Sequence, residues 1–337
     1  MVRRWGQLLM VGLPGPELDE TARWLIQDLQ VGGIILFRRN IMAPPQVAAL
    51  LQACQEAALA ASGLPLLVAV DQEGGPVQRL RHPFPEMPSA CRFGADGDLQ
   101  AVAAAAQQVG AALRALGVNI NLAPVLDVPR SPDCPLWERA YSPDPEQVAR
   151  FGLAAIQGYL AGGVLPVAKH FPGLGATRLD SHLDLPTTAP GEHERRQDLE
   201  PFRQAIAGGV PGVMVAHVVV PEWDDLPASL SPVAVNQVLR RQLGFAGLVF
   251  TDDLEMGAIR RHWSVPQAAQ LAVAAGHDIL LICENPPQVE ASLRALSQAA
   301  DLAGPLEQAR RRVLAQKRRC AAGCNNLPGA WVSPDKK

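Results

Sequence analysis

The sequence predicts a (β/α)8 barrel, in which eight parallel strands alternate with helices and close into one sheet. Short apolar or β-branched runs recur along the whole chain, and alanine- and leucine-rich segments with helical spacing separate them. Such alternation is typical of parallel strands joined by crossover helices. The number of apolar runs, eight, also favours a closed barrel, because an open doubly wound sheet usually needs fewer strands. The eight predicted strands are residues 8–11, 33–37, 66–70, 118–122, 165–168, 213–216, 248–250 and 278–282.

The connecting segments carry the signals of helices and of helix ends. Apolar residues recur in them at three- and four-residue spacing, and glycines stand at the junctions that lead back to the strands. We interpret these glycines as helix stops rather than phosphate-binding loops. One more, basic helix is expected at 305–319, before a Gly/Asn/Pro-rich end whose residues 325–337 are expected to fray. The helices between the strands are predicted at 46–61, 99–116, 146–161, 199–207, 233–243 and 265–275.

The composition favours one globular domain that spans residues 1–337. A length of 337 residues exceeds the usual domain of about 100–200, but barrels of this kind often contain about 250 or more. The 48% hydrophobic content suffices for a packed core, and no change in composition marks a domain boundary. The net charge of -3 and the scattered basic residues argue against a nucleic-acid partner and favour a small, neutral or mildly polar substrate. We expect a monomer.

Targeting and redox signals favour a cytoplasmic location. The apolar run within residues 1–12 is too short for the core of a secretory signal, and no segment reaches the roughly 18 apolar residues of a membrane helix. The six cysteines have the spacing of neither a zinc site nor a disulfide framework. We therefore expect reduced thiols in the cytoplasm, with no membrane, metal or cofactor involved.

Polar side chains follow five of the predicted strands, at the barrel end where (β/α)8 proteins place their chemistry. Any one of them could be structural, because Asp before a helix often caps it and a strand-end His often only hydrogen-bonds a loop. For Asp253, beside an expected helix start, capping and a functional role stand as equal alternatives. The convergence of the whole set on one face nevertheless favours a functional site. The set consists of Asp71, Asp127, Lys169, His170, His217, Asp252 and Asp253.

The loop after the fifth strand, residues 169–182, has the length and the Gly and Pro content of a functional, mobile loop. Asp180 and His182 are two residues apart, and in an extended segment such residues point to the same side. The carboxylate could then fix the imidazole tautomer and raise its basicity, as a general acid/base requires. The alternative, which spacing alone favours, is an Asp-Ser turn beside a solvated His.

These residue types suit glycoside hydrolysis with retention of configuration. That reaction needs one carboxylate to attack the anomeric carbon, and a second group about 5–5.5 Å away to protonate the leaving oxygen and then deprotonate water. Asp252, at a rigid strand end, fits the nucleophile. His182 fits the acid/base, because an unperturbed pKa of about 6.5 gives both protonation states near neutral pH.

Four ordered motifs give the chain a resemblance to a known family. They are VDQEGG at 70–75, KHFPG at 169–173, DSH at 180–182 and TDDLEM at 251–256. Together they resemble the glycoside hydrolase family 3 β-N-acetylglucosaminidases of bacterial cell-wall recycling, from about residue 6 to residue 283. The resemblance implies a retaining exo-hydrolase for terminal β-linked N-acetylglucosamine. It also implies peptidoglycan (muropeptide) fragments as substrates, with chitin fragments as the alternative.

The resemblance further implies roles for individual residues. Asp252 is the nucleophile, and His182 with Asp180 forms the acid/base dyad. The N-acetylglucosamine hydroxyls are held by charged side chains, which suit charge-assisted hydrogen bonds to vicinal hydroxyls. For Arg139, whose surroundings match the family pattern only loosely, a surface salt bridge is the alternative. The implied sugar-binding residues are Asp71, Arg79, Arg139, Lys169 and His170.

Two residues depart from the family pattern. Leu174 stands in the loop where the family usually has His, and Pro76 stands where Arg is common. Neither belongs to the implied nucleophile or dyad. We expect them to affect loop packing and the backbone beside Asp71, and through these the rate or the leaving-group preference.

Three other functions remain as alternatives. β-Glucosidases of the same family take their acid/base from a second domain, which this sequence is expected to lack. Glycosyl transfer to phosphate stays open, because a neutral His repels phosphate less than a carboxylate does. A sugar-binding barrel that has lost catalysis is the alternative from another class, although the implied nucleophile and dyad are intact.

Overall fold

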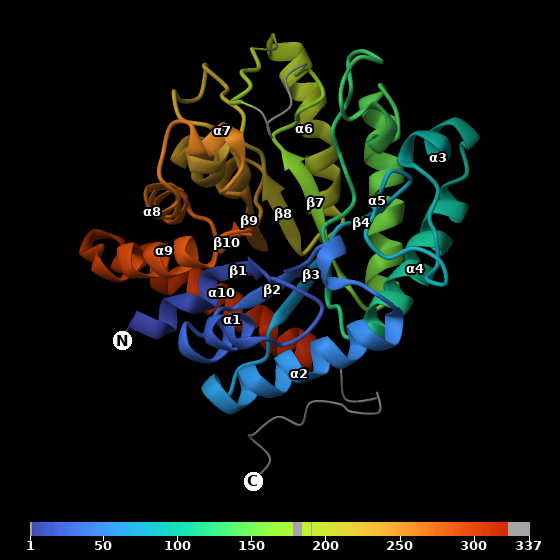
Figure 1. The fold of residues 1–337 in the computed structure, drawn as a ribbon. Helices are drawn as coiled ribbons and strands as arrows, with labels where there is room; N and C mark the ends of the chain where they lie inside the picture. Colours follow the sequence, from blue (N-terminus) through green and yellow to red (C-terminus); the bar gives the residue numbers. More distant parts are fainter. Residues whose placement is uncertain (1, 178–183, 190, 323–337) are drawn as a thin grey trace.

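Eight parallel strands close into a barrel in the order β1-β10-β9-β8-β7-β6-β3-β2, with helices around it (Figure 1). The structure is a computed structural model that describes residues 2–177, 184–189 and 191–322. The predicted (β/α)8 barrel is confirmed, and each predicted run overlaps one of the strands. The barrel strands are β1 (Leu9–Gly12), β2 (Gly33–Leu36), β3 (Leu67–Val70), β6 (Ile120–Asn121), β7 (Leu165–Phe171), β8 (Gly212–Val215), β9 (Leu248–Asp253) and β10 (Ile279–Ile282).

Two strands extend three residues beyond their predicted ends. The predicted runs 165–168 and 248–250 stopped where the apolar residues stop, whereas β7 continues to Phe171 and β9 to Asp253. The added residues include Lys169, whose side chain lines a cavity at the carboxyl ends of the strands instead of packing in the core. The loss of the apolar pattern therefore marks the start of the cavity, not the end of the strand.

Helices surround the barrel, mostly at the predicted places. α4 and α8 have the predicted bounds, whereas α6 begins at Glu192, before the predicted 199–207, because its first turns are polar and carry no apolar periodicity. α9 is absent from the predicted set. Within the described ranges, no helix combines the length and apolar character needed to cross a membrane. The longer helices are α2 (Pro44–Ser62), α4 (Leu99–Leu116), α5 (Pro145–Ala161), α6 (Glu192–Ala207), η6 (Val233–Gln242), α8 (Val265–Ala275), α9 (Pro286–Gln298) and α10 (Ala303–Ala322).

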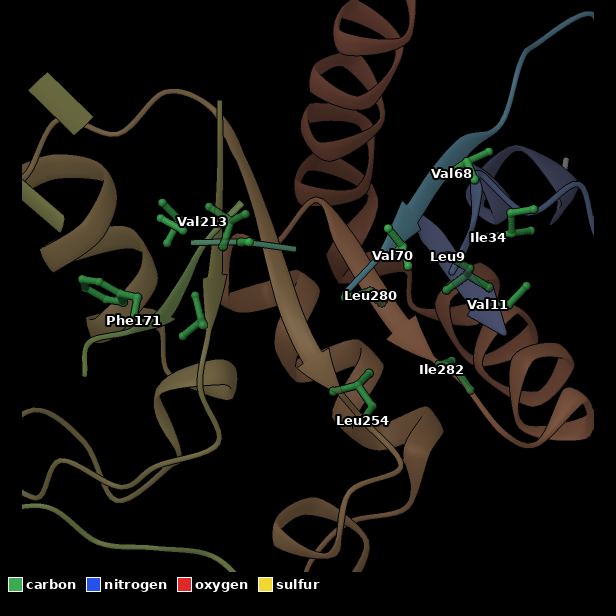
Figure 2. Packing of buried hydrophobic residues seen from close by; sticks show 14 of the residues in the cluster. Leu9, Val11, Ile34, Val68, Val70, Phe171, Val213, Leu254, Leu280 and Ile282 are labelled. Atoms are coloured by element: carbon green, nitrogen blue, oxygen red, sulfur yellow. The ribbon is translucent and has the colours of Figure 1, made fainter. Parts of the chain in front are cut away.

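The two-residue period of the strands divides the apolar residues into two clusters. Along β3, Leu67 and Ala69 belong to the cluster inside the barrel, while Val68 and Val70 belong to the larger cluster between the strands and the helices. Figure 2 shows members of the outer cluster on several strands, among them Val11 and Ile282. This packing holds the strand ends in fixed positions and so provides a rigid base for the side chains that follow them.

A short hairpin of β4 (Gln72–Gly74) and β5 (Val77–Gln78) follows β3. Its turn passes through Gly75 at φ 53, where a Cβ atom would lie 2.5 Å from the Cβ of Ser89. Only glycine tolerates this conformation and this close approach without displacement of the neighbour. Pro76 occupies the exposed tip of the turn. The hairpin fixes the direction of the charged residues on both sides of it.

The opposite, amino-terminal end of the barrel contains a buried lysine. Lys317 of α10 is 2% exposed, and its Nζ donates a 2.6 Å hydrogen bond to Oε1 of Gln7. Gln7 in turn donates from Nε2 to the backbone carbonyl of Gln30 at 2.8 Å. Burial without a carboxylate partner lowers the pKa of Lys317 to about 7. This contact ties the last described helix to the start of the chain.

Lys317→Met is expected to stabilise the protein at neutral pH. A lysine whose pKa is lower in the folded state binds fewer protons there than in the unfolded chain. Its cost to the free energy of unfolding is therefore largest below about pH 7 and shrinks as the pH rises towards the pKa of lysine in the unfolded chain. We expect a gain of about 2–4 kcal/mol at pH 7 that shrinks by pH 10, measured by urea unfolding. Arg318→Met, at an exposed neighbouring position, is the control and should change stability by less than about 0.5 kcal/mol at either pH. A constant gain at both pH values would contradict this explanation.

Candidate active site

A cavity of about 550 Å³ lies at the carboxyl-terminal end of the barrel. The implied nucleophile and the implied sugar-binding residues line it, whereas Asp127 and His217 of the strand-end set do not. The strand ends bring together side chains that are far apart in the sequence, as expected for this fold. Asp180 and His182 of the predicted dyad lie outside the described residues. The predicted residues that line the cavity are Asp71, Arg79, Arg139, Lys169, His170 and Asp252.

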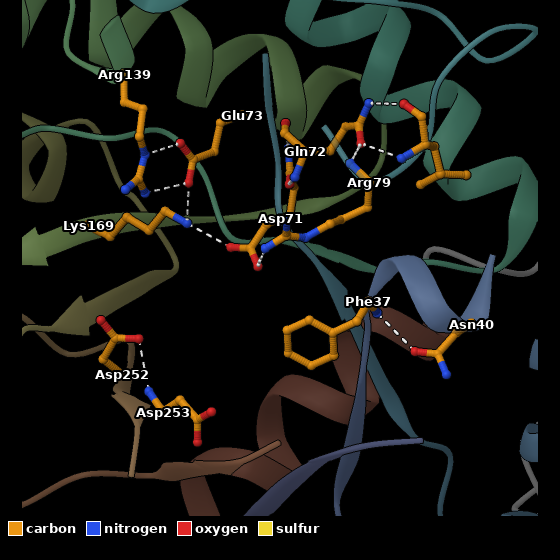
Figure 3. Close-up of polar contacts among 12 residues, drawn as sticks. Phe37, Asn40, Asp71, Gln72, Glu73, Arg79, Arg139, Lys169, Asp252 and Asp253 are labelled. Carbon is orange, nitrogen blue, oxygen red and sulfur yellow. Dashed lines mark hydrogen bonds and ion pairs between the residues drawn. The ribbon is translucent and has the colours of Figure 1, made fainter. Parts of the chain in front are cut away.

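Lys169 is the centre of a charged network on one wall of the cavity (Figure 3). Its Nζ lies 2.7 Å from Oδ1 of Asp71 and 2.6 Å from Oε1 of Glu73. Burial by itself would lower the pKa of Lys169, but the two carboxylates outweigh it and hold the pKa above its ordinary value. Lys169 is therefore a permanent cation whose ammonium group is fixed from two sides.

Arg139 joins the same network through Glu73. Its Nε and Nη2 donate to the two carboxylate oxygens of Glu73 at 2.9 and 2.8 Å, a bidentate arrangement that fixes the guanidinium plane. The alternative of a surface salt bridge is wrong, because the side chain of Glu73 is only 5% exposed and that of Arg139 only 21%. Arg79 completes the wall, with Nη2 3.3 Å from Oδ2 of Asp71.

Glu73 is a site residue that the sequence analysis did not single out. Burial raises the pKa of its carboxyl, but Lys169 and Arg139 together lower the pKa by more than burial raises it, to about 2. A usable sequence signal existed, because Asp71 and Glu73 are two residues apart in an extended segment and so point to the same side. What could not be read from the sequence is that both would meet the same lysine.

His170 is oriented by a second buried carboxylate. Its Nδ1 lies 2.7 Å from Oδ2 of Asp127, and Oδ1 of Asp127 accepts the backbone N–H of Leu174 at 2.7 Å. This contact fixes the orientation of the imidazole ring at the edge of the cavity. Asp127 thus acts as a positioning residue for His170 and for the start of the loop that follows β7. The side chain of Leu174 itself lines the cavity.

Asp252 follows the four buried residues of β9 and stands opposite the charged wall (Figure 3). Burial raises the pKa of its carboxyl, but the side chains of His217 and His170 lower it more, so the pKa lies below its ordinary value. The backbone N–H of Asp253 also donates to Oδ1 of Asp252, at 2.8 Å. The carboxylate is therefore ionised at neutral pH on a rigid strand, as a nucleophile must be.

His217 supports this region from within the core. It is fully buried, with Nδ1 2.7 Å from Oγ of Ser229 and Nε2 2.8 Å from the backbone carbonyl of Asp253. It does not line the cavity. The contact with the carbonyl fixes the end of β9, and we assign His217 to positioning.

Asp253 also lines the cavity, and it is not the N-cap of the following helix. The N-cap of α7 (Gly257–Arg260) is Met256, while Oδ1 of Asp253 accepts the N–H of Glu255 at 3.1 Å in a local turn. Burial raises the pKa of Asp253 to about 7, and the neighbouring charges of Glu255 and Asp252 contribute in the same direction. A carboxyl that titrates near neutral pH therefore adjoins Asp252.

Asp253→Asn is expected to change how stability depends on pH. A raised carboxyl pKa means that between about pH 4 and about pH 7 the folded state holds a proton that the unfolded chain has lost. The free energy of unfolding of the natural protein therefore falls as the pH rises through this range. Relative to the natural protein, the variant should gain about 2–3 kcal/mol between pH 5 and pH 8. Urea unfolding at the two pH values measures it. Asp133→Asn, at an exposed position, should show no such gain, and a pH-independent difference for Asp253→Asn would refute the assignment.

Metal ligation is the remaining possibility for so many polar side chains. Among the residues that the structure describes, no group of three or more His, Cys, Asp or Glu side chains is arranged to hold a metal ion. The described side chains offer acid, base and hydrogen-bonding groups in a cavity large enough for a small sugar.

Comparison with known proteins identifies the family. A family model described as the glycosyl hydrolase family 3 N terminal domain matches residues 2–319. The chain belongs to glycosyl hydrolase family 3. Among relatives of this family 3 protein, a beta-hexosaminidase of Alkalilimnicola ehrlichii is 39% identical over 295 residues, which cover 86% of this chain and 84% of the relative. A beta-hexosaminidase of Thioalkalivibrio sulfidiphilus is 38% identical over 87% of this chain and 85% of its own length.

Solved family 3 structures agree with this assignment. A beta-N-acetylglucosaminidase from Paenibacillus sp. str. FPU-7 is similar with a TM-score of 0.94 and 40% identity, over 99% of this chain and 65% of that chain. A beta-N-acetylhexosaminidase from Beutenbergia cavernae gives a TM-score of 0.87 at 36% identity, over 94% of this chain and 98% of that chain. The predicted family resemblance is confirmed, and this family 3 member is a glycoside hydrolase.

Proposed function

We propose that this protein is a retaining exo-β-N-acetylglucosaminidase that removes terminal β-linked N-acetylglucosamine by double displacement. The observation that carries the proposal is the placement of Asp252. It is an ionised, half-buried carboxylate at a strand end, and it faces a wall of fixed charged groups across a cavity of about 550 Å³. The names of the relatives and structural neighbours support the choice of sugar.

In the proposed first step, the carboxylate of Asp252 attacks the anomeric carbon while the bond to the leaving-group oxygen breaks. His182, oriented by Asp180, gives its proton to that oxygen. In the second step His182 takes a proton from water, the water oxygen attacks the anomeric carbon, and the bond to Asp252 breaks. The dyad roles rest on the sequence resemblance, because both residues lie outside the described part of the chain.

The charged wall is proposed to hold the sugar. Lys169 and Arg139 can donate hydrogen bonds to vicinal hydroxyls, while Asp71 can accept them, and each is already held by a charged neighbour. Such preorganisation lets binding energy orient the anomeric carbon over Asp252. Arg79 and His170 complete the proposed set of sugar ligands.

We further propose peptidoglycan fragments as the natural substrates, with chitin fragments as the alternative. The protein is proposed to act as a monomer in the cytoplasm and to use residues 1–337 as one domain. We propose no cofactor.

The deciding assay compares an aryl β-N-acetylglucosaminide with the matching aryl β-glucoside. We expect turnover of the first and little of the second; the reverse preference would make the protein a β-glucosidase. Equal rates with and without inorganic phosphate are expected, and acceleration by phosphate would indicate phosphorolysis. Binding of a 2-fluoro glycoside without a covalent adduct on Asp252 would indicate a sugar-binding barrel.

His182→Ala is expected to separate substrates by their leaving groups. An activated aryloxide leaves without protonation, whereas a sugar or alkoxide leaving group needs the acid. We expect kcat/KM to fall by about 100-fold to 10,000-fold for a disaccharide and by less than about 10-fold for the first step with a dinitrophenyl glycoside. His193→Ala, which replaces another His of the chain outside the cavity lining, is the control. Equal losses on both substrates would refute the acid/base assignment.

A further inference from the structure

Arg260 is a cation of the cavity that stands apart from the charged wall. It is the last residue of α7, is exposed, and lines the same cavity as Asp252. Within residues 2–177, 184–189 and 191–322, its guanidinium has no ion pair and no side-chain hydrogen bond. An exposed guanidinium that borders a binding cavity is free to meet a ligand, and its planar donors match a carboxylate in two-point geometry.

The Lys and Arg side chains of the charged wall each already contact a carboxylate. Lys169 lies within 2.7 Å of two carboxylates, and Arg139 shares one of them in a bidentate pair. Arg79 contacts Asp71 at 3.3 Å. These paired groups suit neutral sugar hydroxyls, which need oriented donors and acceptors but no net charge. Arg260 differs from them because no carboxylate of the described residues contacts its guanidinium.

The carboxylates on the same side of the cavity are engaged elsewhere. Glu255 accepts the backbone N–H groups of Glu284 and Asn285 at 2.6 and 3.2 Å. The side chain of Glu284 pairs with Nη1 of Arg39 at 2.6 Å. Neither acid therefore competes directly for Arg260.

The position of Arg260 points to the leaving group rather than to the sugar that is cleaved off. Arg260 is exposed, whereas Lys169 on the charged wall is only 2% exposed. A ligand group that meets Arg260 therefore lies towards the solvent-facing part of the cavity. In an exo-acting enzyme, this is the direction in which the leaving group extends from the sugar.

We propose that Arg260 is a specificity-determining residue that binds a carboxylate on the leaving group, so that the enzyme prefers N-acetylglucosaminides whose aglycone is anionic. This inference rests on the proposed function. It adds a preference for a negative charge on the aglycone. The paired cations of the charged wall, which are proposed to hold the sugar, do not account for such a preference.

The test uses two substrates that differ only in that charge. They are the 4-(carboxymethyl)phenyl and 4-(carbamoylmethyl)phenyl β-N-acetylglucosaminides, in which a methylene group insulates the phenol from the substituent. For the natural protein we expect the carboxylate substrate to have a kcat/KM about 3–10-fold higher, mainly through KM, and this preference should fade at high ionic strength. Arg260→Gln should abolish the preference, and Arg260→Lys should retain part of it.

Arg241→Gln is the matched control, because Arg241 is an exposed arginine of η6 that does not line the cavity. It should leave the preference unchanged. Two results would overturn the proposal: no preference in the natural protein, or an equal loss on both substrates in Arg260→Gln, which would place Arg260 in the general machinery. Failure of the proposed function is recognised separately, since the natural protein would then turn over neither N-acetylglucosaminide.

Discussion

Asp252→Asn is expected to lower turnover by at least about 10,000-fold, because an amide cannot form the glycosyl-enzyme bond that double displacement requires. The fold should survive, since the replacement is nearly isosteric and the side-chain oxygen can still accept the N–H of Asp253. The measurements are kcat/KM on an aryl β-N-acetylglucosaminide and circular dichroism for the fold. The natural protein should also acquire a 2-fluoro glycosyl adduct on Asp252, located by mass spectrometry.

Chemical rescue tests the assignment of Asp252 as the nucleophile independently. In Asp252→Ala the space beside the anomeric carbon is vacated, and azide should restore turnover of an activated substrate with formation of the α-glycosyl azide. Asp133→Asn, at an exposed position, should leave turnover unchanged. Residual activity of more than about 1% in Asp252→Asn would contradict the assignment of the nucleophile and would favour attack by the acetamide group of the substrate itself.

Glu73→Gln is expected to reduce both stability and activity. Glu73 holds Lys169 and Arg139 through three contacts of 2.6–2.9 Å, and its removal leaves two largely buried cations with less compensation. Loss of one partner of a buried ion pair costs about 3–5 kcal/mol. Displacement of the proposed sugar ligands by about 1 Å should also lower kcat/KM by about 100-fold. Urea unfolding and steady-state kinetics measure the two effects.

The pH dependence identifies the cause of the stability loss. The lowered pKa of Glu73 means that its contribution is present above the unfolded value of about 4.5 and is lost as the pH falls towards about 2. The difference in the free energy of unfolding between Glu73→Gln and the natural protein should therefore become smaller at acid pH. Glu192→Gln removes an exposed pair with Arg196 on α6 and should cost less than about 0.5 kcal/mol. An equal deficit in the two variants would show that Glu73 is an ordinary surface group.

The strand-end acids show how far the sequence could be used for the site. Asp71 stands directly after an apolar run, and Asp252 stands two residues after another. Parallel strands necessarily bring their carboxyl ends to one face of a closed barrel. Their place in one cavity was therefore predictable once eight runs had been counted. Family motifs then separated the nucleophile from its neighbours, which spacing alone could not do.

The partners of these residues were not predictable in the same way. Glu73 and Arg139 are 66 residues apart, Asp71 and Lys169 are 98 apart, and Asp127 meets His170 across 43 residues. No local period relates such positions. Their distances depend on barrel closure and on the hairpin of β4 and β5, so the bridging role of Glu73 appears only in three dimensions.

The sequence by itself determined the order of strands and helices and the cavity end of the barrel, because the two-residue period of strands and the polar residues that end them are local properties. The proposed role of Asp252 came from the family motifs. The tertiary structure decided which charges are neutralised and which are not. Burial and partner distance set the pKa of Asp253 to about 7 and that of Glu73 to about 2, although both are carboxyls beside strand ends. The same factors leave Arg260 exposed on the cavity while Lys169 is buried between two acids. Electrostatic energy depends on distance and solvent exposure, and only the folded chain defines these.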